Sequence, residues 1–387
     1  MKTAFVAKTL LTPLTSLSRP VVLVEDGQIL AVGNRDEVPI PAGARIEDFG
    51  DAVLAPGMID IHLHGGGGHD IMEASDEALA HVGRQLARHG VTSYLPTTVT
   101  APWDSTRAAL ERLSRLLDHP PLQLEGDACA QPLSVHLEGP FISHLRPGVH
   151  PLADIVEPSL ERFESLWEAS RGRIGLVTMA PELEGALDVV AAAASRGVVV
   201  SMGHTDADLA AAHAGRRAGA SHITHTFNAM RPLNHREPGI LGLALGDPEM
   251  SAEIIADGVH VHPLMVSSFL RLKGNERALL VTDAISATGM GDGTFRLGSF
   301  DVEVHGPLCT TNGVLAGSVL TLDHAVQNAM KFTGWDLLHT ARMASYNPAR
   351  LLGLLPRKGI IAPGADADMV VLTPAGEVVR TIVAGRV

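Results

Sequence analysis

The middle of the chain, residues 55–354, alternates between two hydrophobic patterns. Short apolar runs, which favour buried strands, lie at 58–64, 92–99, 133–137, 174–179, 198–202, 222–226, 253–256 and 278–282. Amphipathic stretches with helical spacing lie between them, at 76–88, 105–117, 159–169, 183–195, 206–218 and 263–272. Strands that alternate with helices in this way predict a closed, parallel (β/α)8 barrel, the TIM-like form of the α/β class.

An open, doubly wound sheet is the alternative fold for this alternation. Such sheets, when they bind dinucleotides, carry a glycine-rich phosphate-binding turn after the first strand. Here the glycines at 65–68 follow histidines of the kind that bind metals, so we do not interpret them as that turn. The barrel is therefore the preferred prediction.

Both ends of the chain show patterns typical of β-structure. Residues 3–6, 20–25 and 29–32 form short apolar runs near the N-terminus, and residues 368–372 and 377–382 do the same near the C-terminus. We expect the two ends, residues 1–54 and 355–387, to pair into a second, small β-sandwich domain. The barrel at 55–354 would then be inserted between the two halves of that domain.

The composition fits a globular chain and limits its partners. Of the 387 residues, 45% are hydrophobic, and 43 acidic residues outnumber 30 basic ones, which gives a formal charge of −13. Nucleic acids and anionic membrane surfaces attract cationic proteins, so neither is an expected partner. A phosphorylated small molecule needs only one or two local cations and stays compatible with this charge.

The cysteines and the apolar runs bear on cellular location. Cys129 and Cys309 are too few for a disulfide framework or a thiolate zinc site. The first residues carry Lys8 within their only apolar run, which is too short for a secretory signal. No stretch approaches the roughly 18 uninterrupted apolar residues of a membrane span. We therefore expect a cytoplasmic protein with reduced thiols.

Histidines gather at the predicted strand ends, and the first pair is His62 and His64. Side chains two apart on a strand face the same side, so both would point into the barrel mouth. Neutral imidazoles bind zinc-like divalent cations well. Two core histidines held by hydrogen bonds are the alternative interpretation of this pair alone. Histidines on the predicted helices, such as His81 and His213, are expected to lie on solvent-exposed faces instead.

Four more predicted strands end in a side chain that can bind a metal, namely Glu138, His204, His225 and Asp283. A carboxylate buried at a strand end is costly unless a cation compensates it. The carboxyl ends of barrel strands form the face where barrel enzymes build their active sites. His222 lies three residues before His225 and so faces the opposite side of the strand. We assign His225 to the site and give His222 a packing or supporting role.

Several short motifs occur in order along nearly the whole chain. They are PGMIDIHLHG at 56–65, HLEGP at 136–140, GHT at 203–205, HTFNAM at 225–230, DGVH at 257–260, TDA at 282–284 and LAGS at 315–318. Together they resemble the N-acetylglucosamine-6-phosphate deacetylase family of the amidohydrolase superfamily. HLEGP, FNAM and DGVH are highly specific to that family, whereas the His-x-His pair is common across the superfamily. The predicted β-domain also resembles the second domain of the superfamily.

The resemblance implies a divalent metal bound by Glu138, His204 and His225, with a second metal at His62 and His64. Some family members lack the His-x-His pair and use one metal. Here the pair is intact, so one or two metals per subunit are implied, with Glu138 bridging when two are bound. Zinc is the first expectation for this set of ligands, and iron, manganese and cobalt are the alternatives.

Asp283 is the residue that we expect to move the proton in such a site. Amide hydrolysis needs a nucleophile at neutral pH, a polarised carbonyl and a proton for the leaving amine. A divalent metal lowers the pKa of its bound water and withdraws charge from the carbonyl oxygen. We expect Asp283 to accept the proton of that water and return it to the sugar nitrogen. The alternatives for Asp283 are a metal ligand without a proton role or a supporting carboxylate.

Matching positions also imply contacts with the substrate. They are Val149, His150, Asn228, Ala229, Arg236, His260, Leu315, Ala316 and Gly317. The resemblance places Arg236 and His260 near the 6-phosphate, where a guanidinium fork suits a dianion. Arg231 competes with Arg236 but lacks the match. In related enzymes the phosphate-binding Arg and His can come from the partner subunit, so the resemblance implies a homodimer. Residues 289–312 are predicted to form a hairpin over the mouth, as a lid.

These implications predict hydrolysis of the acetamido group of N-acetyl-D-glucosamine 6-phosphate to D-glucosamine 6-phosphate and acetate. The setting would be amino-sugar catabolism and the recycling of cell-wall sugars. Another amidohydrolase, acting on a cyclic amide or a nucleobase, would explain the metal ligands but would leave Arg236 and His260 without a role. A non-catalytic descendant that serves as a scaffold usually loses metal ligands, and all the matched ones are present here.

Overall fold

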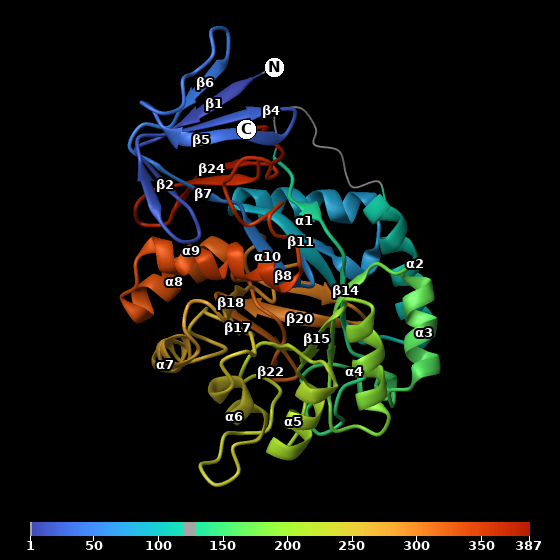
Figure 1. The fold of residues 1–387 in the computed structure, drawn as a ribbon. Helices are drawn as coiled ribbons and strands as arrows, with labels where there is room; N and C mark the ends of the chain where they lie inside the picture. Colours follow the sequence, from blue (N-terminus) through green and yellow to red (C-terminus); the bar gives the residue numbers. More distant parts are fainter. Residues whose placement is uncertain (1, 119–127) are drawn as a thin grey trace.

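The computed structural model describes residues 2–118 and 128–387 (Figure 1). The strands of the middle segment are β8 (Met58–Leu63), β11 (Val91–Thr98), β13 (Val135–Glu138), β14 (Ile174–Met179), β15 (Val199–Met202), β16 (His222–Ile223), β17 (Ala252–Ile255) and β18 (Ala278–Val281). Neighbouring strands run parallel, in the order β8-β11-β13-β14-β15-β16, and β17 pairs with β18. This is the strand order that a parallel barrel requires.

The two pieces of sheet join at both of their edges through backbone hydrogen bonds. On one side, the Ile223 amide donates to the Ser251 carbonyl at 3.0 Å, and the Thr226 amide donates to the Glu253 carbonyl at 2.9 Å. On the other side, the Asp283 amide donates to the His62 carbonyl at 2.9 Å. The strands therefore curl into a ring, which confirms the prediction of a TIM-like barrel.

Helices cover the outside of this ring (Figure 1). They are α1 (Asp76–Arg88), α2 (Trp103–Asp118), α3 (Leu160–Ala169), α4 (Ala186–Ser195), α5 (Leu209–Ala218), α6 (Gly239–Gly246), α7 (Pro263–Lys273), α8 (Leu322–Thr333), α9 (Leu337–Met343) and α10 (Tyr346–Leu351). In α1, Leu79, Val82 and Leu86 are buried at helical spacing. The Ser75 side chain caps α1 by accepting a hydrogen bond from the Ala78 amide at 3.1 Å.

Several elements are shorter than the sequence pattern predicts, and three of them show a local cause. α5 begins at Leu209 because the Asp208 side chain accepts from the Ala211 amide at 2.8 Å and caps the helix there. α4 begins only after Gly185, whose φ of 79° lies in the left-handed region. β16 ends at Ile223 because the chain turns at His225, which has a φ of 21°. The apolar run at 222–226 predicts a strand through residue 226 and gives no indication of this turn.

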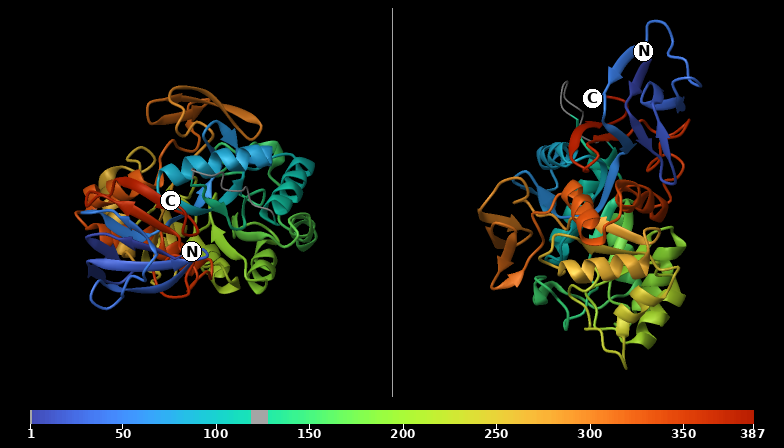
Figure 2. Two further views of the ribbon diagram at one scale, coloured as in Figure 1. Left: turned by 90° about the horizontal axis from the view of Figure 1, so that it is seen from above. Right: turned by 90° about the vertical axis from the view of Figure 1, so that its left-hand side faces the viewer.

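Strands from both ends of the chain lie beside the barrel in two sheets (Figures 1 and 2). One sheet has the order β5-β4-β1-β6, and the other has the order β24-β23-β7-β2-β3. Their bounds are β1 (Thr3–Val6), β2 (Thr9–Leu11), β3 (Ser16–Ser18), β4 (Pro20–Glu25), β5 (Gln28–Asn34), β6 (Arg45–Asp48), β7 (Val53–Pro56), β23 (Met369–Leu372) and β24 (Val378–Ile382). Phe5, Val22, Leu54, Val371 and Ile382 belong to one apolar core that both sheets share.

A four-stranded antiparallel sheet projects from one side of the barrel (Figure 2). It consists of β19 (Gly293–Leu297), β20 (Phe300–His305), β21 (Leu308–Thr311) and β22 (Val314–Leu315). It contains the hairpin predicted at 289–312 and has a small core of its own, in which Val302 packs with Ile285. Short elements complete the description: β9 (Gly65–Gly66), β10 (His69–Asp70), η1 (Ile71–Glu73), β12 (Gln131–Pro132) and η2 (Leu152–Asp154). Within the described residues, none of the helices combines the length and apolar character needed to cross a membrane.

Candidate active site at the barrel mouth

Glu138, the last residue of β13, lies at the centre of the predicted site. Its Oε1 is 3.3 Å from Nε2 of His62 and 3.4 Å from Nε2 of His204. The same oxygen is 3.4 Å from Nε2 of His225, and its Oε2 is 3.2 Å from Nε2 of His64. All of these side chains are buried. The structure thus brings predicted ligands from the ends of three other strands, β8, β15 and β16, to the carboxylate of Glu138.

Asp283 follows β18 and completes this cluster on the side of His64. Its Oδ1 lies 3.2 Å from Nε2 of His64 and 3.7 Å from Nε2 of His62. The Asp283 side chain is 12% exposed, whereas that of Glu138 is 2% exposed. Asp283 is therefore the carboxylate that a bound molecule can reach more easily.

The backbone is strained at the residues that aim these side chains. His204, His225 and Asp283 each follow a barrel strand and have φ values of 47°, 21° and 52°. Residues with side chains rarely adopt positive φ, and such strain collects at functional sites because the surrounding structure must hold it in place. Here the left-handed residues end the strands at the point where their side chains meet.

The two buried carboxylates of the cluster need positive charge close to them. Burial by itself would raise the pKa of the Glu138 carboxyl, but the charge of His62 and the close approach of the other imidazoles hold that pKa well below its usual range. Burial likewise opposes ionisation of Asp283, yet His62 and His64 lower its pKa to about 2. In the other direction, burial disfavours protonated His64, but its hydrogen bonds to Asp283 and Glu138 raise its pKa to about 9. Two buried carboxylates therefore require either protonated imidazoles or a metal cation.

The donor atoms of the cluster fit a divalent metal. His204 Nδ1 lies 3.1 Å from the Arg146 carbonyl and so carries a hydrogen, which leaves a lone pair on Nε2. That Nε2 faces Nε2 of His225 at 3.0 Å. Among the described residues, His62 Nε2 and Glu138 Oε1 are buried without a hydrogen-bond partner. Ligating atoms gather in two groups, His62 with His64 and Asp283, and Glu138 with His150 and His204.

Glu253 of β17 contacts the cluster, and the sequence interpretation did not include it. Its Oε1 lies 2.6 Å from Nδ1 of His62 and accepts a hydrogen bond from the His225 amide at 2.9 Å. Its Oε2 lies 3.1 Å from Nε2 of His222, for which a packing or supporting role is predicted. A carboxylate on the far ring nitrogen fixes a histidine so that the other nitrogen points at the metal. The sequence feature that could have identified Glu253 is an acidic residue inside the apolar run Ala252-Glu253-Ile254-Ile255.

A cavity of about 300 Å³ opens beside the cluster. Its lining includes His64, Glu138, Val149, His150, His204, His225, Asn228, Ala229, His260, Asp283, Leu297, Val314, Leu315 and Gly317. Most positions predicted to contact substrate therefore lie around one space. Ala316 does not line it; this residue is fully buried, and its amide donates to the Cys309 carbonyl at 3.0 Å.

Arg236 lies outside this cavity. It is exposed on the loop before α6, where its amide donates to Asn234 Oδ1 at 2.9 Å. Its competitor Arg231 is held by Glu237 at 3.1 Å. No lysine or arginine is among the described residues that line the cavity, so positive charge there must come from histidines such as His64 and His260. Burial opposes protonation of His260, but Asp257, at 2.7 Å, raises its pKa.

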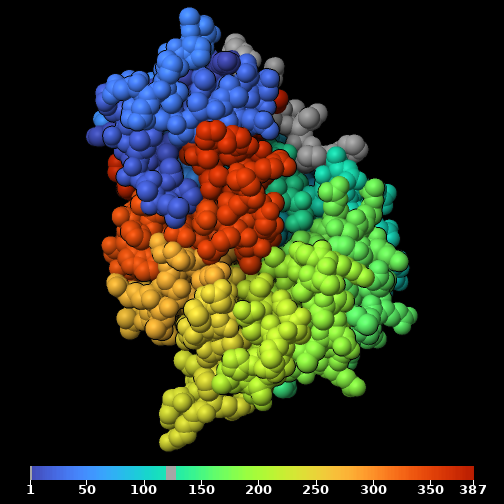
Figure 3. Space-filling view, viewed as in Figure 1, coloured from blue at the N-terminus to red at the C-terminus, as the bar shows by residue number. Residues whose placement is uncertain are grey.

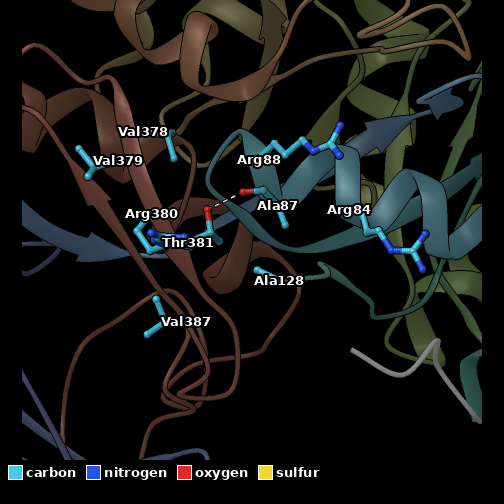
Figure 4. A pocket seen from close by; sticks show the side chains of 9 residues that line it. All are labelled: Arg84, Ala87, Arg88, Ala128, Val378, Val379, Arg380, Thr381 and Val387. Atoms are coloured by element: carbon cyan, nitrogen blue, oxygen red, sulfur yellow. Dashed lines mark hydrogen bonds between the residues drawn. The ribbon is translucent and has the colours of Figure 1, made fainter. Parts of the chain in front are cut away.

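A second hollow, of about 190 Å³, lies between α1 and β24 (Figure 4). It is lined by Arg84, Ala87, Arg88, Ala128, Val378, Val379, Arg380, Thr381 and Val387. This set contains neither a carboxylate side chain nor a histidine, and it lies away from the strand ends. It offers none of the groups that hydrolysis needs, so the chemistry belongs to the barrel mouth.

Comparison with known proteins gives relatives over nearly the whole length. N-acetylglucosamine-6-phosphate deacetylase of Bacillus subtilis (strain 168) is 37% identical over 365 residues, covering 94% of this chain and 91% of the relative. N-acetylgalactosamine-6-phosphate deacetylase of Escherichia coli O157:H7 is 37% identical over 367 residues, covering 95% and 94%.

Solved structures agree with these relatives. A variant of N-acetyl-D-glucosamine-6-phosphate deacetylase from Mycobacterium smegmatis, in complex with N-acetyl-D-glucosamine-6-phosphate, matches with a TM-score of 0.91 at 34% identity and covers 100% of this chain and 98% of its own. The N-acetylglucosamine-6-phosphate deacetylase of Thermotoga maritima matches with a TM-score of 0.86 at 34% identity, with coverage of 100% and 99%. Residues 53–387 match the amidohydrolase family. The chain therefore belongs to the amidohydrolase family of metal-dependent hydrolases and, within it, to the N-acetylglucosamine-6-phosphate deacetylases.

Proposed function

We propose that this protein hydrolyses the acetamido group of N-acetyl-D-glucosamine 6-phosphate to D-glucosamine 6-phosphate and acetate, in amino-sugar catabolism and cell-wall sugar recycling. The main support for the proposal is that the side chains of Glu138, Asp283 and four histidines lie together at the edge of a cavity large enough for a sugar. Relatives that match nearly the whole chain and are named for this activity support it.

The residues around Glu138 would hold one or two divalent metals. One set is Glu138 with His204 and His225, and the other is His62 with His64. Imidazole and carboxylate ligands favour zinc, with iron, manganese or cobalt as alternatives. When bound, the metal supplies an activated water at neutral pH and withdraws charge from the amide carbonyl. Glu253 keeps His62 in the tautomer that this role needs.

Asp283 is the group that we assign to proton transfer. Its Oδ1 lies beside His64, and its partly exposed carboxylate lines the cavity that would receive the amide. Neighbouring imidazoles keep Asp283 ionised, so it can accept a proton from water and pass it to the leaving nitrogen. His150, which lies 3.5 Å from Glu138 and also lines the cavity, is placed to contact the acetamido group or a sugar hydroxyl.

The 6-phosphate would lie near His260, Asn228 and Ala229, and we propose that Arg236 joins them from a second copy of the chain. The loop before α6, which carries Arg236, projects from the barrel in Figures 1 and 3. An exposed arginine on such a loop can reach a neighbouring subunit more readily than its own cavity. We therefore propose a homodimer in which each copy completes the phosphate site of the other, and the exposed position of Arg236 supports it.

Arg236→Ala should lower kcat/KM for the phosphorylated sugar by roughly ten- to several-hundred-fold, because a charge-assisted contact to phosphate contributes about 1.5 to 3 kcal/mol per bond. The slow reaction on unphosphorylated N-acetylglucosamine should scarcely change, since that substrate never makes the contact. Acetate release from both substrates measures this contrast. Arg231→Ala is the matched comparison, and equal losses on both substrates in Arg236→Ala would show that the phosphate is bound elsewhere.

The substrate itself is tested by an acetate-release assay on a small set of N-acetyl sugars. N-acetylglucosamine 6-phosphate should be hydrolysed with the highest kcat/KM. N-acetylgalactosamine 6-phosphate, the substrate named for one relative at 37% identity, differs only at the C4 hydroxyl and is the closest competitor. A preference for the galacto epimer would reassign the substrate, and activity on neither phosphosugar would contradict the proposal.

We also propose that the chain divides into two domains, a barrel at 55–354 and a small β-sandwich domain at 1–54 and 355–387. The pairing of β7 with β23 and the core shared by both terminal sheets support this division. We propose a cytoplasmic location as well. Its support is that Cys129 and Cys309 are buried free thiols, as expected in a reducing compartment.

A further inference from the structure

A second cluster of metal-ligating side chains lies where the hairpin of β9 and β10 meets α1. His69 belongs to β10, whereas Glu77 and His81 lie one turn apart on α1. One ligating atom of each residue lies within 4.8 Å of those of the other two. His81 is exposed, as predicted for a helical histidine, but it lies beside another histidine. None of the three residues belongs to the barrel-mouth site.

Hydrogen bonds set both histidines in the form that binds a metal. His69 Nδ1 lies 3.1 Å from Oε2 of Glu73, and His81 Nδ1 lies 2.9 Å from the carbonyl oxygen of Glu77. Both neighbours are oxygen acceptors, so each Nδ1 donates a hydrogen bond, and in the neutral ring this leaves the lone pair on Nε2. Histidines that ligate metals typically donate their other ring N–H to a carboxylate or a backbone carbonyl in this way.

The surroundings also favour a cation over two free imidazoles. The rings of His69 and His81 are stacked, with centroids 4.5 Å apart and an interplanar angle of 27°. Two protonated imidazoles at this separation would repel each other, whereas two neutral ones can share a cation. Within the part of the chain that the structure describes, the Glu77 carboxylate makes neither a hydrogen bond nor an ion pair and is therefore available as a third ligand. Of the three residues, only His81 lines a neighbouring cavity of about 450 Å³, which Arg84 and Arg88 also line and which has room for the water that completes a fourfold site.

We propose that His69, Glu77 and His81 bind a divalent cation of the zinc type, separate from the metals of the barrel mouth. Two imidazoles, one carboxylate and a water form a donor set that suits zinc. A cation there would tie the β9–β10 hairpin to α1. The same hairpin directly follows His64, and its Asp70 side chain accepts from the Gly298 amide of the projecting sheet at 2.7 Å. The role is therefore structural, holding the segment between the catalytic strand β8 and the sheet that borders the cavity.

The test compares total bound zinc in the wild-type protein, His81→Ala and His213→Ala after equilibration with excess Zn²⁺. His213 is an exposed histidine on α5 and serves as the matched control. The wild type and His213→Ala should each hold one equivalent per chain more than His81→Ala. Added Zn²⁺ should also raise the melting temperature of the wild type further than that of His81→Ala. Both readouts leave the barrel-mouth ligands unchanged.

Equal zinc content in the wild type and His81→Ala would overturn the proposal. Retained deacetylase activity of His81→Ala confirms that the variant is folded, because His81 lies outside the barrel mouth. Glu77→Gln provides the same comparison if His81→Ala fails to fold, since it keeps the size of the side chain on an exposed helix face. Loss of an equivalent in Glu77→Gln supports the site, and full zinc content contradicts it.

Discussion

Asp283→Asn is expected to lower kcat on N-acetylglucosamine 6-phosphate by roughly a hundredfold or more, the scale of lost acid–base catalysis. An amide cannot accept the proton of the attacking water, although it occupies the same volume beside His64. Metal content should stay largely intact, because Glu138 and the histidines that surround it are unchanged. KM should move little, since the residues assigned to the sugar and the phosphate are also unchanged. Steady-state kinetics together with metal analysis of the purified variant measures both expectations.

Asp323→Asn is the matched control for that experiment. Asp323 is also a buried aspartate beside a histidine, His89, at 3.1 Å, but it lies outside the cavity lining. It should keep near-normal kcat. Turnover close to wild type in Asp283→Asn would remove the proton role from Asp283. A large loss of bound metal in that variant would instead favour the alternative that Asp283 is mainly a ligand.

Most of the barrel and of the ligand cluster could be predicted from the sequence, because both follow from local rules. Apolar runs between amphipathic helices identify parallel strands, and polar residues at their carboxyl ends meet on one face. His62 and His64 share a side of β8 through the two-residue repeat of a strand. Glu138, His204 and Asp283 could likewise be predicted as site residues, since each lies at the end of an apolar run. These inferences need no knowledge of how distant segments pack.

The residue that the sequence missed, and the surroundings of the residues that it named, depend on that packing. Glu253 contacts His62 across the barrel, a distance of 191 positions along the chain that no local pattern encodes. Arg236 matched a phosphate-binding position, yet a loop that projects from the barrel holds it outside its own cavity. The pairing of His69 with His81 depends on how a glycine-rich hairpin folds against α1. Local spacing identifies which residues can act, whereas tertiary structure decides which of them meet.

Glu138→Gln is expected to lose the metal of the barrel mouth almost completely, whereas His62→Asn should lose at most one of two equivalents. Both oxygens of Glu138 face imidazole nitrogens within 3.4 Å, so among the described residues it is the side chain best placed to contact every metal bound there. A neutral amide is a poorer ligand for a divalent cation than a carboxylate. His62 contributes a single nitrogen, and the set around His204 and His225 does not depend on it.

Metal-to-protein stoichiometry of the two variants and the wild type decides between a bridging and a peripheral Glu138. Substituting Gln for Glu138 removes one negative charge from a site where burial disfavours charge and imidazoles compensate it. The fold can therefore survive, and circular dichroism should show the same helix content as the wild type. The proposed site at His69 and His81 would still bind one metal ion per chain in both variants. The difference in metal content between the wild type and His81→Ala, measured in parallel, gives this contribution, which is then subtracted. If Glu138→Gln binds as many metal ions at the barrel mouth as the wild type does, Glu138 does not bridge the metals. The histidines would then be sufficient ligands.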